Sequence, residues 1–202
     1  KELKKLPQEA KEDAAANHNL EQWKTQGYEI IDEMYESLQS KFGEIGKDWW
    51  VLTAEELLMV PFDDYDFKFK GFIDLVIATK DDKIHLIDWK TTSWGWNSKK
   101  KSDSTLAYQL VFYKYFYAKK HDVDPKDVEC HFALLKRTAK PGSKVEFIRV
   151  TTGPKRIENA LNTLNTAVYN ITNKRYTKNK LNCRSCKDRF GTCEFYQTEY
   201  CS

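Results

Sequence analysis

An acid and a base lie two positions apart at the end of a short apolar run in residues 84–92. Side chains two positions apart in a β-strand point to the same face, so Asp88 and Lys90 would project together. A carboxylate beside an ammonium can hold a metal ion and stabilise developing negative charge. The competing interpretation is a solvated charge pair on an edge strand, which is common in a chain with many charged residues.

A second acid lies upstream, in the β-branched run of residues 71–77. Residues 80–83 between the two runs have turn composition, so the runs are expected to pair as a hairpin. This pairing can bring Asp74 and Asp88 to one edge of a sheet, where two carboxylates would suit Mg²⁺ or Mn²⁺. Such a metal polarises a phosphate and activates water, while Lys90 stabilises charge or positions the nucleophile.

Downstream, residues 104–120 have the apolar spacing of a helix. Gln109 and Tyr113 are four positions apart in it and therefore share one face. The loop before this helix, residues 93–102, alternates indoles with lysines, a combination suited to stacking on bases and binding phosphates. The alternative is that one tryptophan caps the core and the lysines are solvated. The candidate nucleic-acid contacts in the loop are Trp94, Trp96, Lys99 and Lys100.

A Gly-x-Ile-Asp strand, a turn, an Asp-x-Lys-Thr strand and a helix with Gln-x-x-x-Tyr follow one another. In this order they resemble the PD-(D/E)xK nuclease superfamily, and most closely its RecB-like exonuclease branch. The resemblance implies an α/β fold, with a mixed central sheet of about five strands flanked by helices, as in restriction endonucleases. It also implies metal-dependent hydrolysis of phosphodiester bonds in DNA, in single strands or at duplex ends, and favours exonuclease action in DNA processing, replication or recombination.

The resemblance also implies roles for individual residues. Asp74 and Asp88 would bind the metal by side chain and Trp89 by its main-chain carbonyl, and Lys90 would be the catalytic base or charge stabiliser. Gln109 and Tyr113 would contact the nucleic acid. The pattern has a Glu on the strand before Gly-x-Ile-Asp, and Glu56 matches this position better than Glu55. A solvent-facing Glu pair is the alternative, because a strand needs polar residues on its outer face.

The first helix departs from the RecB-like pattern. That pattern places a metal-binding His a few residues after a Gly, but here Gly27 is followed by Ile31 at the corresponding position. The nearest histidine, His18, precedes the Gly and is a weak candidate for a third side-chain ligand, since a lone His is more often a surface residue.

Four of the five cysteines, Cys183, Cys186, Cys193 and Cys201, lie in the last 20 residues. Clustered cysteines with a Cys-x-x-Cys spacing indicate metal binding before disulfides. Related nucleases, including CRISPR-associated adaptation nucleases and the AddB type, have a similar cysteine trio that holds a [4Fe–4S] cluster with one more Cys upstream. Here Cys201 would have to be the fourth ligand, unless that ligand lies outside this sequence. A [4Fe–4S] cluster, Zn²⁺, a metal-free relic and oxidative disulfides all remain open.

The 202 residues, 41% hydrophobic and 14% aromatic, suffice for one domain with a real core. We expect a nuclease core with an N-terminal helical region in residues 1–180 and a Cys-rich metal-binding tail in residues 181–202. The net charge of +3 does not by itself indicate a nucleic-acid partner. No run is long enough to span a bilayer and no signal-peptide core follows the first residues, so we expect a cytoplasmic protein.

Two rival functions remain. One is a nucleic-acid-binding module that has lost catalysis, which the altered first helix favours and the intact Asp74, Asp88 and Lys90 oppose. The other is a nuclease domain within a larger helicase or polymerase that works with other replication or recombination proteins. The second rival fits a sequence that does not begin with Met.

Overall fold

The computed structural model describes residues 8–62, 65–175, 187–188, 191–193 and 196–199, with no side chains described for 8–18, 187, 188 and 191. The chain divides into two compact units, Lys1–Ala160 and Leu161–Ser202. The first unit carries the sheet and all the contacts analysed below. The division near residue 180 that the sequence suggested stays a prediction.

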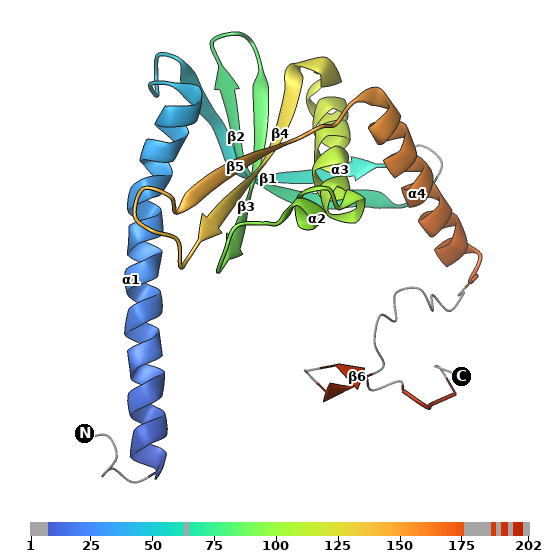
Figure 1. The fold of residues 1–202 in the computed structure, drawn as a ribbon. Helices are drawn as coiled ribbons and strands as arrows, with labels where there is room; N and C mark the ends of the chain where they lie inside the picture. Colours follow the sequence, from blue (N-terminus) through green and yellow to red (C-terminus); the bar gives the residue numbers. More distant parts are fainter. Residues whose placement is uncertain (1–7, 63–64, 176–186, 189–190, 194–195, 200–202) are drawn as a thin grey trace. The chain divides into compact units, whose positions relative to one another are not determined.

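The first unit is built on one mixed sheet of five strands in the order β1-β2-β3-β4-β5 (Figure 1). The β1/β2, β2/β3 and β4/β5 pairs are antiparallel, and β3/β4 is parallel. The strands are β1 Trp49–Pro61, β2 Lys68–Thr79, β3 Ile84–Thr92, β4 Val128–Lys136 and β5 Val145–Val150. This arrangement confirms the predicted α/β class with a mixed sheet of five strands flanked by helices.

The helices are α1 Gln8–Phe42, α2 Ser98–Lys101, α3 Ser104–His121 and α4 Pro154–Thr172, with a short 3₁₀ helix at Pro125–Asp127. Asp103 caps α3 by accepting hydrogen bonds from the backbone N–H groups of Thr105 and Leu106. The short helix α2 lies in the segment that the sequence predicted as a loop, and Asn97 caps it by accepting from the backbone N–H of Lys100. In the second unit, the two-residue strands β6 Lys187–Asp188 and β7 Gly191–Thr192 pair with each other.

Helices α1 and α3 cover opposite faces of the sheet. Leu38 and Phe42 of α1 pack with Ile77, Ile87 and Ala133 on one face. On the other face, Asp88 is hydrogen-bonded to Gln109 of α3. Because side chains alternate along a strand, β3 thus presents one set of residues to α1 and another to α3.

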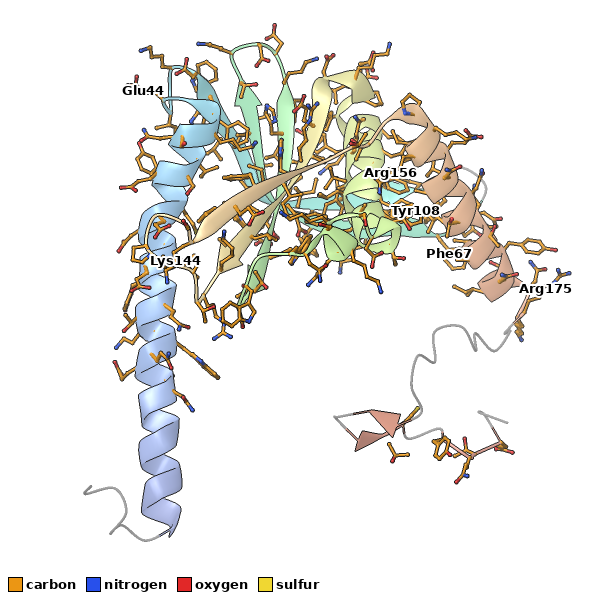
Figure 2. All side chains as sticks on the ribbon, in the orientation of Figure 1. Glu44, Phe67, Tyr108, Lys144, Arg156 and Arg175 are labelled. Atoms are coloured by element: carbon orange, nitrogen blue, oxygen red, sulfur yellow. The ribbon has the colours of Figure 1, made fainter. Side chains whose placement is uncertain are left out.

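Helix α1 runs from Gln8 to Phe42, and those of its described side chains that are buried against the sheet lie in its C-terminal half. Trp23 and Ile31 remain 59% and 62% exposed, whereas Ile30 and Leu38 are buried. The side chain of Glu33 accepts backbone hydrogen bonds from the β4–β5 turn, and Glu29 forms an ion pair with Lys144 at 2.5 Å. Figure 2 labels Lys144 in this turn, between β4 and β5. Within the described residues, no helix is long and apolar enough to cross a bilayer.

Candidate active site

Asp74 lies at the point where β2 and β3 separate. The paired residues of these strands run from Ala78↔Ile84 to Leu75↔Ile87, so Asp74 is the first residue beyond the ladder. Its carboxylate Oδ2 accepts a hydrogen bond of 2.7 Å from the backbone N–H of Trp89. The side chain thereby bridges the opening between the strands and is held next to Asp88, as the hairpin pattern predicted.

Asp88 is almost completely buried, with 2% of its surface exposed. Its Oδ1 accepts a hydrogen bond of 2.9 Å from Gln109 Nε2. Its Oδ2 is buried, and its described neighbour is the Lys90 ammonium, which forms an ion pair with it at 2.6 Å. Burial raises the pKa of Asp88, Lys90 acts in the opposite direction, and the charge of Asp74 adds to the rise.

Lys90 projects from the same face of β3 as Asp88, as expected for residues two positions apart. Its side chain is 29% exposed, in contrast to the 3% of Asp88. The ammonium lies 5.8 Å from the centre of the Phe132 ring, which provides a cation–π contact from β4. The Lys90 ammonium therefore contacts a buried carboxylate, while the side chain is partly exposed to solvent and to a substrate.

Helix α3 brings Gln109 and Tyr113 to this site. Gln109 Nε2 donates to Asp88 Oδ1 and also to the Tyr113 hydroxyl, 3.1 Å away. The Tyr113 ring is packed so closely over Gly71 that a Cβ at this position would lie 2.8 Å from Tyr113 Cε1. The Gly of the Gly-x-Ile-Asp strand thus gives room for the tyrosine of the Gln-x-x-x-Tyr motif, a contact that sequence reasoning did not foresee.

The donor atoms at this site fit a hard divalent cation. Two carboxylates, Asp74 and Asp88, lie at the strand opening, and Asp88 Oδ2 is buried without a hydrogen bond. This oxygen faces the Lys90 ammonium at 2.6 Å, so a bound divalent ion would share it with Lys90. Oxygen ligands of this type are those that Mg²⁺ and Mn²⁺ prefer.

Glu56 is paired with Ile73, the residue before Asp74, but its carboxylate is engaged elsewhere. Its carboxylate lies 2.7 Å from Lys120 Nζ and 2.8 Å from His121 Nε2, at the C-terminal end of α3. Burial raises the pKa of Glu56, but the hydrogen bonds to Lys120 and His121 outweigh this and hold the pKa below its usual range. These partners follow Gln109 by eleven and twelve residues, or about 16 Å along the helix axis.

The two tryptophans of the loop differ in exposure. Trp94 is 74% exposed, whereas Trp96 is 8% exposed and packs against Phe132, with ring centres 5.2 Å apart. The alternative in which one tryptophan caps the core therefore describes Trp96. Lys99 and Lys100 are exposed on α2, and Lys100 Nζ lies 4.8 Å from the Trp96 ring centre. Trp94 and these two lysines remain accessible to a ligand.

The remaining sequence candidates lie mainly outside the described residues. Cys183, Cys186 and Cys201 belong to the segments that are not described, and the side chain of His18 in α1 is not described either. Cys193 is described and is partly exposed. Metal binding by the tail stays a prediction.

Sequence reasoning missed one cluster, formed by His85, Glu129 and His131. Their ligand atoms lie within 4.8 Å of one another, and they form the one possible metal-binding group of three or more such residues found in the described part of the chain. In sequence, His85 is 46 residues from His131, and only the parallel β3/β4 register, with Ile87 opposite His131, brings them together. One sign of this cluster was present in the sequence: His85 lies three positions before Asp88 and therefore on the opposite face of the same strand.

Comparison with known proteins identifies the family to which this sequence belongs. The sequence model of the PD-(D/E)XK nuclease superfamily matches residues 1–190. A crystal structure of a protein from Eubacterium rectale, described as a candidate exonuclease, is similar with a TM-score of 0.50 and 13% identity. The match covers 76% of this chain and 55% of that protein, so the chain spans about half the length of this structural relative. No curated protein is similar enough to this chain to count as a match.

Proposed function

The chain belongs to the PD-(D/E)XK nuclease superfamily, and from this premise we propose that it is a deoxyribonuclease that uses Mg²⁺ or Mn²⁺ and acts as an exonuclease. The proposed substrate is DNA with a free end, either single-stranded or duplex. The proposed setting is DNA processing during replication or recombination in the cytoplasm. The alternative is a nuclease domain within a larger helicase or polymerase protein that works with other replication or recombination proteins.

The observation that carries the proposal is the state of Asp88. This carboxylate is 2% exposed, has a raised pKa and keeps one oxygen without a hydrogen bond, while Lys90 lies 2.6 Å away. A charge buried in this way is unfavourable for folding alone. A carboxylate whose pKa is raised by burial and that lies beside a second carboxylate is typical of catalytic sites.

Each residue has a defined task in the proposed reaction. Asp74 and Asp88, with the main-chain carbonyl of Trp89, would hold the divalent ion, which when bound polarises the phosphate and lowers the pKa of water. Lys90 would orient the attacking water and stabilise the negative charge that develops on the phosphate. Gln109 holds Asp88 Oδ1, and the Trp89 N–H holds Asp74, so both carboxylates are oriented before substrate arrives.

Residues at the rim of the site support the nucleic-acid part of the proposal. The exposed Trp94 offers a face on which a base can stack, and Lys99 and Lys100 on α2 offer charge for the phosphates. Trp96 is packed in the core against Phe132 and does not stack on a base. The hydrogen-bonded pair Gln109 and Tyr113 beside Asp88 is the feature that favours the RecB-like branch.

The tail belongs to the proposal as a separate structural metal site. Cys183, Cys186, Cys193 and Cys201 would bind a [4Fe–4S] cluster or Zn²⁺, because thiolates suit these metals and not Mg²⁺. A brown colour and iron in freshly purified protein would indicate the cluster, and zinc without colour would indicate Zn²⁺. Finding neither metal would reject this part while leaving the nuclease proposal untouched.

The deciding experiment compares end-labelled linear DNA with circular DNA, each incubated with the protein and Mg²⁺. We expect release of labelled nucleotides from linear single-stranded or duplex DNA and intact circles, with no release by the Asp88→Asn variant. Cleavage of circles would show endonuclease action. A parallel labelled RNA would test the choice of DNA. Equal cleavage by wild type and Asp88→Asn would contradict the assignment of the site.

The second candidate is a nucleic-acid-binding module without catalysis. The observation in its favour is Ile31, which stands where the RecB-like pattern has a metal-binding histidine and is 62% exposed. Binding of DNA without cleavage of any substrate, in Mg²⁺ and in Mn²⁺, would establish this candidate in place of the first.

A further inference from the structure

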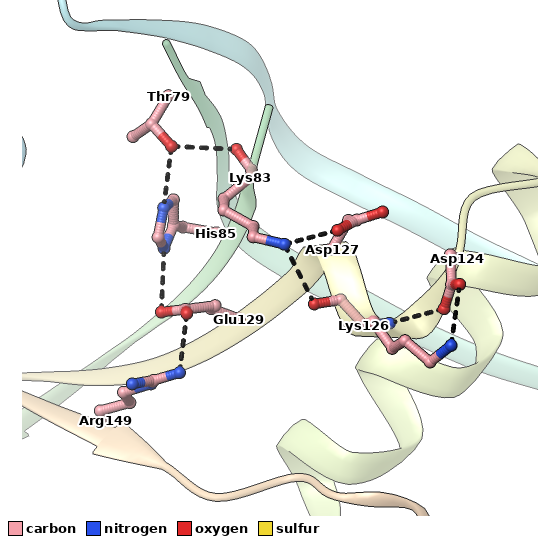
Figure 3. Close-up of polar contacts among 8 residues, drawn as sticks. All are labelled: Thr79, Lys83, His85, Asp124, Lys126, Asp127, Glu129 and Arg149. Atoms are coloured by element: carbon pink, nitrogen blue, oxygen red, sulfur yellow. Dashed lines mark hydrogen bonds and ion pairs between the residues drawn. The ribbon is translucent and has the colours of Figure 1, made fainter. Parts of the chain in front are cut away.

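His85, Glu129 and His131 gather on the α1 face of the sheet, away from Asp88. His85 comes from β3 and the other two come from β4, where Glu129 is paired with His85 in the ladder. Figure 3 shows His85 between Thr79 and Glu129, with Arg149 on the far side of Glu129. We propose that these three side chains bind a transition-metal ion such as Zn²⁺, at a site separate from the carboxylates of the nuclease site.

The distances between the three ligand atoms fit such an ion. His85 Nδ1 lies 3.0 Å from His131 Nε2, and Glu129 Oε2 lies 3.8 Å from the first and 3.9 Å from the second. The point in the plane of these atoms that is equidistant from them is about 2.1 Å from each, which matches the Zn–N and Zn–O bond lengths of about 2.0–2.2 Å; a tetrahedral ion lies slightly outside this plane, so the three atoms must approach it a little. The triangle can therefore accept the ion with only small side-chain movements.

Neighbouring groups orient two of the ligands. Thr79 Oγ1 donates to the Lys83 carbonyl at 3.2 Å and can accept from His85 Nε2, also at 3.2 Å. This places the His85 proton on Nε2 and leaves Nδ1 free to bind a metal. Arg149 donates to Glu129 Oε1 at 2.7 Å, which leaves Oε2 directed at the imidazoles. Hydrogen bonds of this kind from a second layer of residues are usual around metal-bound histidines and carboxylates.

Both imidazoles are already neutral, which is the form that binds metal. Burial lowers the pKa of His85 and lowers that of His131 to about 3. Without the ion, His131 Nε2–H donates to His85 Nδ1; with it, the proton of His131 moves to Nδ1. His131 Nδ1 is buried without a hydrogen-bond partner in the described structure, so this move leaves an unpaired N–H whose cost the metal bonds must exceed.

The chemistry of the ligands selects a metal different from that of the nuclease site. Two imidazoles and one carboxylate suit Zn²⁺ and similar ions, whereas Mg²⁺ prefers oxygen ligands only. The cluster borders an open cavity of about 670 Å³, from which water can supply the fourth ligand. Three cationic residues line this cavity. Arg149 is paired with Glu129, Lys80 is paired with Asp48, and Lys41 Nζ lies 5.4 Å from the ring centres of Phe42 and Phe147.

The test is a zinc titration of the full chain by calorimetry and metal analysis, with excess Mg²⁺ present to occupy the carboxylate site. Wild type is compared with Glu129→Gln and His85→Asn, studied separately so that a folding failure in one leaves the other. Asp82→Asn is the matched control, because Asp82 is exposed in the neighbouring turn between β2 and β3 and is not one of the three ligands. Binding to the tail cysteines contributes equally to all these proteins and cancels in the differences.

We expect wild type and Asp82→Asn to bind one Zn²⁺ more than either folded variant, or to bind it about 100-fold more tightly. With Co²⁺, the part of the spectrum lost in the variants should lack thiolate-to-metal charge-transfer bands. Equal zinc stoichiometry and affinity in all four proteins would overturn the proposal, as would a lost signal with thiolate bands. Neither result depends on whether the protein cleaves DNA.

Discussion

Strand β3 carries two polar groupings of opposite character on its two faces. Toward α3, the carboxylate site (Asp74, Asp88 and Lys90) has a buried charge with a raised pKa. Toward α1, the histidine cluster (His85, Glu129 and His131) keeps its imidazoles neutral, because burial lowers their pKa values. Burial disfavours the charged form in both groups. In the carboxylate site the result is an acid that a cation can stabilise, and in the histidine cluster the result is neutral nitrogen ligands.

The difference shows how one strand can carry two ligand sets that suit different metals and do not contact each other. Alternation places His85 and Asp88, three positions apart, on opposite faces. Oxygen ligands at the strand opening suit Mg²⁺ or Mn²⁺, whereas the imidazoles suit Zn²⁺. If this separation is correct, a substitution at one group should leave metal binding at the other unchanged.

The largest expected effect is that of Asp88→Asn on cleavage. The rate should fall by about 10³-fold or more, because removing a metal ligand removes several kcal/mol of charge stabilisation in the transition state. Zinc binding at the histidine cluster should be the same as in wild type. Single-turnover cleavage and a zinc titration check the two halves, and a variant that loses both would show that the two groupings are one coupled site.

Lys90→Ala should have the next largest effect, a loss of about 10² in rate, the usual scale for one positioned electrostatic or proton-transfer group. Binding of Mn²⁺ should largely survive, because the ammonium is not a ligand. Calorimetry with Mn²⁺ separates the two properties. If the metal is lost together with activity, Lys90 holds Asp88 in place and is not part of the chemistry.

Much of the carboxylate site follows from local rules. Strand alternation predicts that Asp88 and Lys90 share a face, a hairpin predicts that Asp74 meets them, and a helical interval of four predicts the Gln109–Tyr113 pair. The structure shows each of these placements. All three depend on contacts within one strand, one hairpin or one helix, which is why periodicity reveals them.

The features that sequence reasoning missed depend on contacts between distant segments. Glu56 meets Lys120, 64 residues away, and His85 meets His131, 46 residues away. The difference between Trp94 and Trp96 depends on Phe132, which fills the space beneath only one of them. No local sequence pattern specifies the register of two parallel strands. None specifies which of two tryptophans is buried against the core.

A moderate effect is expected for Gln109→Ala, which removes the hydrogen bond that orients Asp88 Oδ1. Loss of such a supporting contact typically costs about 10–100-fold in metal affinity or activity. The matched control is Gln39→Ala, because Gln39 Nε2 donates to the Tyr35 hydroxyl at 2.9 Å on α1, in a similar Gln–Tyr pair remote from Asp88. Equal Mn²⁺ affinity and cleavage rates for the two variants would remove Gln109 from the carboxylate site.

The smallest expected effect, that of Glu56→Gln, tests where the carboxylate site ends. The pattern of related sequences groups Glu56 with Asp74 and Asp88, but the structure pairs it with Lys120 and His121. The Glu56 side chain is 12% exposed and its two partners are each 37% exposed, so losing the charge should lower the free energy of unfolding by about 1 kcal/mol.

Cleavage by the folded variant should stay within about threefold of wild type, since a contact about 16 Å along α3 from Gln109 does not touch the substrate. Denaturant unfolding and single-turnover cleavage measure the two quantities. A loss of activity like that of Asp88→Asn, without a loss of stability, would mean that Glu56 leaves Lys120 and joins the metal when DNA binds.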